Sequence, residues 1–130
     1  MDSFELEIVD GVAVVKVDSS TATLRDAHLL LQTFENESIF DWNKIVLDLS
    51  SCTFIDSTFI GMVVKIFRMV DKKNTRLKLV FPQVSDISSF QLVGISRIID
   101  CYKSLEDAVE SFGSYSFVER IVIDQEAILN

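Results

Sequence analysis

The sequence of 130 residues is 48% hydrophobic and 25% charged, a balance that predicts one globular domain and excludes a disordered chain. The formal net charge of −8 argues against nucleic acid as the main partner, because binding to phosphates needs a basic face. No apolar run is long enough to cross a bilayer and no secretory leader opens the chain, so we expect a cytoplasmic protein without membrane insertion. Its two cysteines, Cys52 and Cys101, are expected to be free thiols in that reducing compartment.

Hydrophobic periodicity predicts strands and helices in alternation. A β-hairpin opens the chain over residues 4–17, because apolar residues alternate with acids up to the turn signal Asp10-Gly11. Apolar residues at helical spacing behind polar caps then predict helices at residues 19–36, 57–73, 83–93 and 104–112. The apolar positions of the first helix are Leu24, Ala27, Leu31 and Phe34. Short β-branched runs predict strands at residues 43–55, 75–81 and 96–100, the first of them central in the sheet.

The ends of the later elements also carry signals. Pro82 ends the strand before it, and Gly94 is placed to end the third helix by adopting a left-handed conformation. Ser104 and Asp107 form the capping-box pattern at the start of the last helix. Because strands that alternate with helices imply right-handed crossovers, we expect an α/β fold: a mixed, mostly parallel sheet opened by the hairpin and packed with about four helices.

The stretch Asp56-Ser57-Thr58 stands between the central strand and the second helix. With Asp56 as the N-cap, Ser57 is the first helical residue. A helical wheel then places a basic stripe on the solvent side and apolar residues opposite it. The stripe is Ser57, Gly61, Lys65, Arg68 and Lys72, bordered by Met62, Met69 and Val64, and the opposite side is Phe59, Ile60, Val63, Ile66, Phe67 and Val70. Flexible methionines beside an exposed stripe are typical of an adaptable protein contact.

Two interpretations of this stretch stay open on the residues alone. In the plainer one, Ser57 and Thr58 are capping hydroxyls and the stripe is an ordinary solvated face. In the other, Ser57 is an exposed phosphorylation site at a helix N-terminus. A phosphate there would add roughly two negative charges to a contact surface and would switch binding off.

An enzyme is the poorest interpretation. The only histidine, His28, lies in the first predicted helix, and nothing places it beside Ser57 as a base. The nucleophile elbow, the glycine-rich phosphate loops and the spacings of metal ligands are absent from the sequence, so we expect no catalysis, no metal and no cofactor. Asp48 is expected to be the solvent-side end of its strand rather than a phospho-accepting aspartate.

Three stretches, taken in order and spacing, resemble one family. They are DSSTATL at residues 18–24, IVLDLSSCTFIDSTFIG at residues 45–61 and FQLVGISRIIDCYKSLEDAV at residues 90–109. Together these motifs resemble the STAS domain, a family named for sulphate transporters and anti-sigma factor antagonists. The resemblance covers residues 4–112, and without a membrane span the chain is more similar to the stand-alone antagonists than to a transporter tail.

The resemblance implies a switch between protein partners. In this family, the unphosphorylated antagonist binds an anti-sigma factor that is also a serine protein kinase of the GHKL ATPase type, and the sigma factor is released. The kinase phosphorylates the serine after the motif aspartate, and a metal-dependent serine phosphatase reverses that step. Carried over, Ser57 is the phosphoacceptor, with Thr58 as the second candidate. The resemblance and the helical wheel together assign partner binding to Asp18, Thr21, Asp56, Thr58, Gly61, Met62, Lys65 and Arg68.

Two departures from the family pattern keep an alternative open. Phe59 stands where the family usually has glycine, although the helical wheel points it inward. Residues 114–130 extend past the domain expected over residues 1–113, and their run 116–123 predicts an extra strand for a sheet edge or for a homodimer. These departures favour an unphosphorylated STAS scaffold in a stressosome-like assembly, or a transporter-associated subunit. A small-molecule sensor ranks last, because no glycine-rich loop is present.

Overall fold

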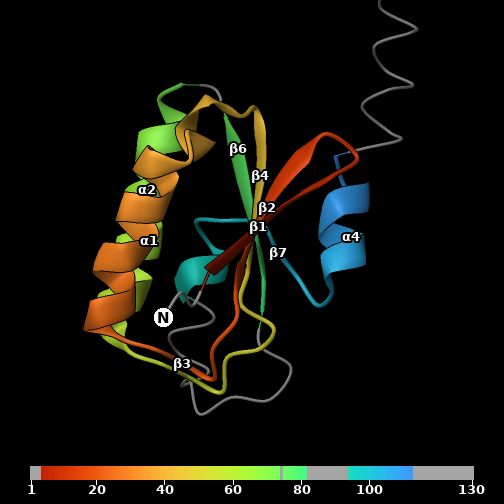
Figure 1. Ribbon diagram of the computed structural model, residues 1–130. Helices are drawn as coiled ribbons and strands as arrows, with labels where there is room; N and C mark the ends of the chain where they lie inside the picture. The colour runs from red at the N-terminus through yellow and green to blue at the C-terminus, as the bar shows by residue number, and fades with distance from the viewer. Residues whose placement is uncertain (1–3, 74, 82–93, 113–130) are drawn as a thin grey trace, which may run out of the picture.

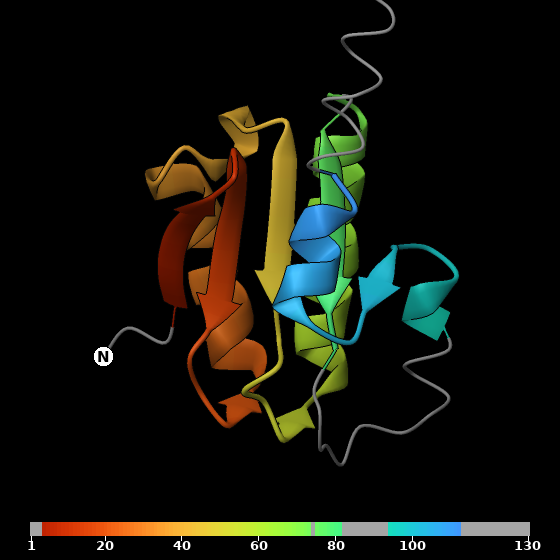
Figure 2. The ribbon, with the colours of Figure 1, turned by 90° about the vertical axis from the view of Figure 1, so that its right-hand side faces the viewer.

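The computed structural model of the chain describes residues 4–73, 75–81 and 94–112. Among these residues, five strands form one mixed sheet in the order β1-β2-β4-β6-β7 (Figures 1 and 2). Their bounds are β1 Phe4–Val9, β2 Val12–Val17, β4 Lys44–Asp48, β6 Arg76–Val80 and β7 Cys101–Tyr102. β1 is antiparallel to β2 and the other neighbours are parallel, which confirms the expected mixed, mostly parallel sheet.

Helices cover both faces of this sheet and give the molecule three layers (Figure 1). α1 (Leu24–Asn36) and α2 (Ser57–Asp71) pack side by side on one face, and α4 (Leu105–Glu110) lies on the other. The larger hydrophobic core fills the space between the sheet and the α1–α2 pair, and a smaller one lies beneath α4. The central strand β4 is therefore buried on both faces, as parallel strands usually are.

The predicted hairpin is confirmed, with a two-residue turn between β1 and β2. Asp10 and Gly11 have φ values of 50° and 79°, a left-handed conformation whose twist matches that of the strands it joins. Glycine has no Cβ to oppose such a φ, and aspartate tolerates it better than most residues do. Val9 lies opposite Val12, and the register continues to Phe4 opposite Val17.

A second, two-stranded sheet and a short helix are not predicted by the sequence. β3 (Thr21–Ala22) pairs in parallel with β5 (Phe54–Ile55), which joins the chain entering α1 to the chain entering α2. The 3-10 helix η1 (Ile39–Asp41) precedes β4 and buries Ile39. Elements of two or three residues are too short to produce a hydrophobic period.

The prediction that Gly94 ends a helix in a left-handed conformation is wrong. Residues 94–96 are helical, and Gly11 is the only described glycine with a positive φ. Glycine permits both conformations, so its identity alone does not select one. The strand end at Pro82, the helix predicted over 83–93 and the extra strand predicted over 116–123 lie outside the described residues.

The final strand begins later than predicted. Ile95 and Ile99 are both buried, and the Ile99 N–H donates to the Ile95 carbonyl at 2.9 Å, a helical contact one turn apart. Pairing with β6 therefore starts only at Cys101, opposite Leu79. Within residues 96–100 only Ile99 enters the core, in a turn that follows the helical residues 94–96, and the sequence pattern does not distinguish this turn from a strand.

Asp48 is buried, and the expectation of a solvent-side aspartate is wrong. Its side chain is 3% exposed, and its carboxylate accepts the Ser50 N–H at 2.9 Å. The residue is the last of β4, which lies between β2 and β6, so neighbouring strands and α4 cover a position that would be open at a sheet edge.

Candidate functional site

The segment that follows β2 and the segment that precedes α2 are tied together by the β3–β5 pair. The Ser20 carbonyl accepts hydrogen bonds from the backbone N–H groups of Thr53 and Phe54, at 2.7 and 3.1 Å. The Asp56 N–H donates to the Ala22 carbonyl at 3.0 Å. These bonds hold the starts of α1 and α2 beside each other at the carboxyl ends of parallel strands, where α/β folds usually place their sites.

Asp56 lies where the N-termini of α1 and α2 converge. It is the N-cap of α2, and its carboxylate accepts hydrogen bonds from the Phe59 N–H at 2.9 Å and from the Thr58 hydroxyl at 2.8 Å. Desolvation alone would raise the pKa of Asp56, but these bonds, with backbone N–H groups of Leu24 and Thr58, lower the pKa below its ordinary value. Asp56 is therefore a charged and well-held cap.

The hydroxyls of Ser57 and Thr58 differ in their contacts. Both side chains are exposed. The Thr58 hydroxyl donates to Asp56, whereas the Ser57 hydroxyl makes no hydrogen bond within the described part of the chain. Ser57 is the first residue of α2, where free backbone N–H groups and the helix dipole favour a negative charge. Of the two hydroxyls, that of Ser57 is the freer to receive a phosphate.

The predicted partner-binding residues lie along a surface that begins at this site. Asp18, Thr21, Thr58, Gly61, Lys65 and Arg68 are exposed, and Asp56 and Met62 are half-buried. Thr21 pairs with Phe54, two residues before Asp56, and Gly61, Met62, Lys65 and Arg68 follow along α2. Arg68 lies about 16 Å along the helix axis from Ser57, so the structure does not bring all of these residues to one point.

Phe59 is fully buried in the larger core, which confirms the inward direction given by the helical wheel. The apolar side predicted for α2 is confirmed as well, because Val63, Ile66 and Val70 are buried with it. The Phe59 side chain therefore does not cover the exposed Ser57.

Two exposed apolar side chains beside Asp56 are not predicted by the sequence. Leu24 is 52% exposed and Phe54 is 43% exposed. Leu24 was expected on the apolar side of its helix, but as the first helical residue it lies beyond the core. Neighbouring residues of a strand point to opposite faces, so only one of Phe54 and Ile55 can enter the core, and Ile55 does. This alternation is the feature of the sequence from which the exposure of Phe54 could have been predicted.

Gly61 is an exposed glycine in the interior of α2. No described atom outside its own helix lies within 4 Å of the position that a Cβ would take. Glycine at such a position makes a helix less stable than alanine does, by about 1 kcal/mol. The fold therefore does not require a glycine at this position. A partner whose backbone approached α2 closely would require one, because glycine has no Cβ.

Metal binding and thiol chemistry find no support among the described residues. No group of three or more His, Cys, Asp and Glu side chains in that part of the chain is placed to hold a metal ion, and His28 is exposed on α1. Burial, and then the charges of Asp26 and Asp48, raise the pKa of the Cys52 thiol to about 11, so it is a poor nucleophile.

No described helix has both the length and the apolar character needed to cross a membrane.

The chain is similar in sequence to known proteins over most of its length. The profile of the STAS domain matches residues 3–108. A Thermotoga maritima protein named as a candidate anti-sigma factor antagonist is 29% identical over 108 residues, which are 82% of this chain and 95% of that protein. Its Thermotoga neapolitana homologue is 28% identical over 108 residues, with the same coverage of 82% and 95%.

Solved structures show the same fold. The crystal structure of the Thermotoga maritima candidate antagonist superposes with a TM-score of 0.67 at 28% identity, covering 83% of this chain and 92% of that one. The anti-sigma factor antagonist SpoIIAA in its unphosphorylated form gives a TM-score of 0.63 at 16% identity, covering 83% of this chain and 94% of that one. At 16% identity, the similarity to SpoIIAA shows a shared fold and nothing about function.

Proposed function

Because the chain belongs to the STAS domain family, we propose that it is an anti-sigma factor antagonist whose protein binding is switched by phosphorylation of Ser57. The main support is the Ser57 hydroxyl, which is exposed and without a hydrogen bond to the described residues at the start of α2. The names of the two Thermotoga relatives support the same class of function.

A phosphate on Ser57 would act through local electrostatics. It would add roughly two negative charges next to the ionised Asp56. The dipole of α2 favours this charge and the carboxylate opposes it, so we expect the fold to tolerate the modification while the surface changes its charge. SpoIIAA, which shares the fold, has been solved in both unphosphorylated and phosphorylated forms, and this supports phosphorylation as a state that the fold accommodates.

The surface around Ser57 suits a protein partner. Leu24 and Phe54 supply exposed apolar area, and Gly61 leaves room for a close approach. Lys65 and Arg68 add positive charge along the same helix of an otherwise acidic chain. Apolar anchors with a charged rim are typical of protein interfaces, and this rim would attract acidic groups. The partner we propose is an anti-sigma factor that is also a serine kinase of the GHKL type, with a metal-dependent serine phosphatase to restore the hydroxyl.

Phosphopeptide mapping of the protein isolated from its native cells tests the switch. We expect phosphate on Ser57, in the peptide that spans residues 45–65, under at least one growth or stress condition. The Thr58→Val variant keeps Ser57 and should retain the phosphate, whereas Ser57→Ala should lose it. If Ser57→Ala still carried phosphate on Thr58, the phosphorylated residue would be Thr58 and not Ser57. A bare peptide under every condition would contradict the switch and favour the unphosphorylated scaffold.

A further inference from the structure

β1 is an edge strand whose outer side has no partner among the described residues. It is the first strand in the sheet order and pairs only with β2 there. Because Val9 and Val12 flank the two-residue turn, alternate residues from Val9 bond to β2, and the backbone groups of Phe4, Leu6 and Ile8 point outward. Such a row of free donors and acceptors is a template for another strand.

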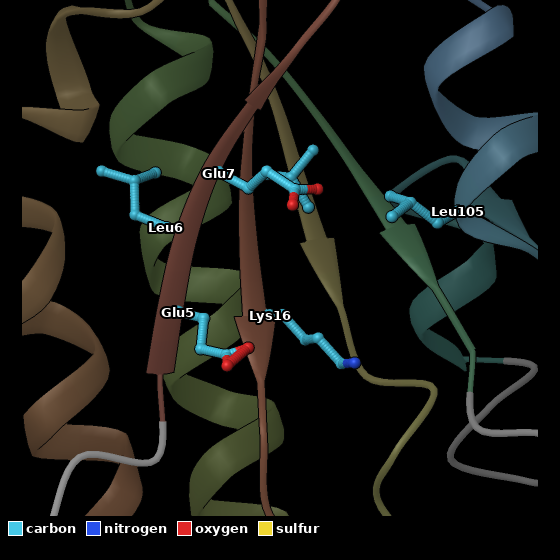
Figure 3. A pocket seen from close by; sticks show the side chains of 6 residues that line it. Glu5, Leu6, Glu7, Lys16 and Leu105 are labelled. Atoms are coloured by element: carbon cyan, nitrogen blue, oxygen red, sulfur yellow. The ribbon is translucent and has the colours of Figure 1, made fainter.

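The side chains of β1 define what would fit this edge. Leu6 is 39% exposed and Ile8 is 49% exposed, on the face of the sheet that carries α1 and α2. Glu5 and Glu7 point to the other face, beside a hollow of about 320 Å³ that Lys16 and Leu105 also line (Figure 3). An added strand would need apolar side chains on the Leu6 face and a cation on the Glu7 face.

The described part of the chain ends at the same end of the sheet as Val9. Phe112, two residues past α4, is buried in a cluster with Val12 and Val14, and Val9 packs against the same cluster. Figures 1 and 2 show the β1–β2 turn and the C-terminal end of α4 at the same end of the sheet, and Figure 2 shows β4 between them. The 18 residues that follow Phe112 include the run Val-Glu-Arg-Ile-Val-Ile at 118–123. The six Cα–Cα steps from Phe112 to Val118 can span about 20 Å. This matches about four strand spacings, the distance from β6, which Phe112 contacts, to the outer side of β1.

We propose that residues 118–123 occupy the free edge of β1 in the same molecule, as an antiparallel strand that starts at Val9 and ends at Phe4. The direction follows from the exit point, since the chain leaves α4 at the Val9 end of β1. Pairing of β1 with β1 of a second copy is the poorer alternative, because it would set acidic residues of the two strands against each other.

This register matches side chains on both faces of the sheet. Arg120 lies opposite Glu7, and Ile121 lies opposite Leu6. Val118 and Ile123 lie opposite the apolar ends of β1. Cross-strand pairs of opposite charge or of two apolar residues each stabilise a sheet, by about 0.2–1 kcal/mol. The two mixed pairs, Ile8 with Glu119 and Glu5 with Val122, bring no like charges together.

A disulfide tests the register directly. In the full chain, Glu5→Cys with Val122→Cys forms a pair whose Cα atoms would lie about 4.5 Å apart, within the reach of a disulfide. The native thiols interfere little, since burial raises the pKa of Cys52 to about 11 and that of Cys101 to about 12. The matched control is Ile98→Cys with Val122→Cys, because Ile98 is exposed near the other edge of the sheet.

We expect the Glu5–Val122 pair to oxidise within one molecule about tenfold faster than the control pair. Equal rates in the two pairs, or no disulfide in either, would overturn the proposal. Covalent dimers in place of the intramolecular product would also overturn it, because they would assign the segment to the edge of a second copy.

Charge reversal gives an independent test in the full chain. Arg120→Glu should speed amide hydrogen exchange at Leu6 and Ile8 about fivefold, because it sets two acids opposite each other. Glu7→Arg combined with Arg120→Glu should restore the slow exchange, and Lys72→Glu, the same charge change at the exposed end of α2, should leave it unaltered. Unchanged exchange in Arg120→Glu, or failure of the double variant to restore it, contradicts the pairing. Glu7 and Arg120 are not among the residues assigned to the Ser57 surface, so the outcome is independent of the proposed function.

Discussion

At the scale of single residues, Leu24 and Phe54 are the exposed apolar side chains that adjoin the Asp56 cap. Buried aromatic and apolar anchors usually contribute most of the free energy of a protein interface. We expect Leu24→Gln and Phe54→Gln each to weaken partner binding about tenfold or more, and to change the free energy of unfolding by no more than about 1 kcal/mol. Calorimetric titration with the partner and urea unfolding measure the two effects.

Ile98→Gln is the matched control for these substitutions. Ile98 is 44% exposed, but it lies beside Phe67 and Asp71 in the later part of α2, away from Ser57. Its substitution should leave partner binding unaltered, and Ser57→Asp should abolish binding as the reference for the switched-off state. Equal losses in Ile98→Gln and Phe54→Gln would show that the effect is not confined to the proposed surface.

The Asp56 carboxylate predicts a loss of stability in acid. Its pKa is lowered in the folded protein, so its contribution is complete above the ordinary pKa of 3.8 and is lost as the pH falls through the lower folded value. We expect Asp56→Asn, which keeps a capping oxygen, to be less sensitive to acid below about pH 4. Asp56→Ala should cost about 1 kcal/mol at neutral pH through loss of the cap. Urea unfolding from neutral pH to below about pH 4 measures both effects. If the free energy of unfolding fell equally with pH in the parent and in Asp56→Asn, the stabilising role of the ionised Asp56 would be contradicted.

At the scale of elements, α2 contains a glycine where an alanine would fit. No described atom outside the helix would meet a Cβ at Gly61. We expect Gly61→Ala to raise the free energy of unfolding by about 1 kcal/mol in urea unfolding, because alanine restricts the unfolded chain and favours the helix. The same methyl group should weaken partner binding if a backbone approaches Gly61 closely. If Gly61→Ala is more stable and still binds the partner as tightly as the parent, Gly61 is not part of the interface.

At the scale of the whole molecule, two cores of unequal size hold the three layers together. Phe34 is fully buried in the larger core, with its ring centroid 5.2 Å from that of Phe40. Phe112 is fully buried in the smaller core, where the Lys78 Nζ lies 4.2 Å from its ring centroid. Lys78 also bonds to the Ser111 hydroxyl at 2.7 Å, so its ammonium group keeps a partner when the ring is removed.

These cores should respond differently to truncation. We expect Phe34→Ala and Phe112→Ala to destabilise the protein by about 3–5 kcal/mol each, with Phe112→Ala at the lower end. The smaller core is closed by a helix of six residues near the described end of the chain, so it relaxes around a cavity more easily. Urea unfolding gives both values, and a larger cost for Phe112→Ala would show that α4 is the more strongly coupled layer.

Features that depend on near neighbours in the chain were predictable. The Asp10-Gly11 turn and the caps at Asp56 and Ser104 each need only residues within one turn, and all are present. Gly94 was not predictable in this way, because glycine accepts helical and left-handed conformations alike. The burial of Asp48 follows from the position of β4 between two other strands, which no neighbour in the sequence specifies.

The candidate site combines both kinds of feature. Its residue types and the basic stripe of α2 follow from capping and helical periodicity, which act between residues a few positions apart. Its assembly depends on contacts such as that of the Thr53 hydroxyl with the Ser20 carbonyl, 33 residues away in the sequence. The exposure of Leu24 and Phe54 also appears only when the layers are packed, because solvent contact is set by what the rest of the chain leaves uncovered.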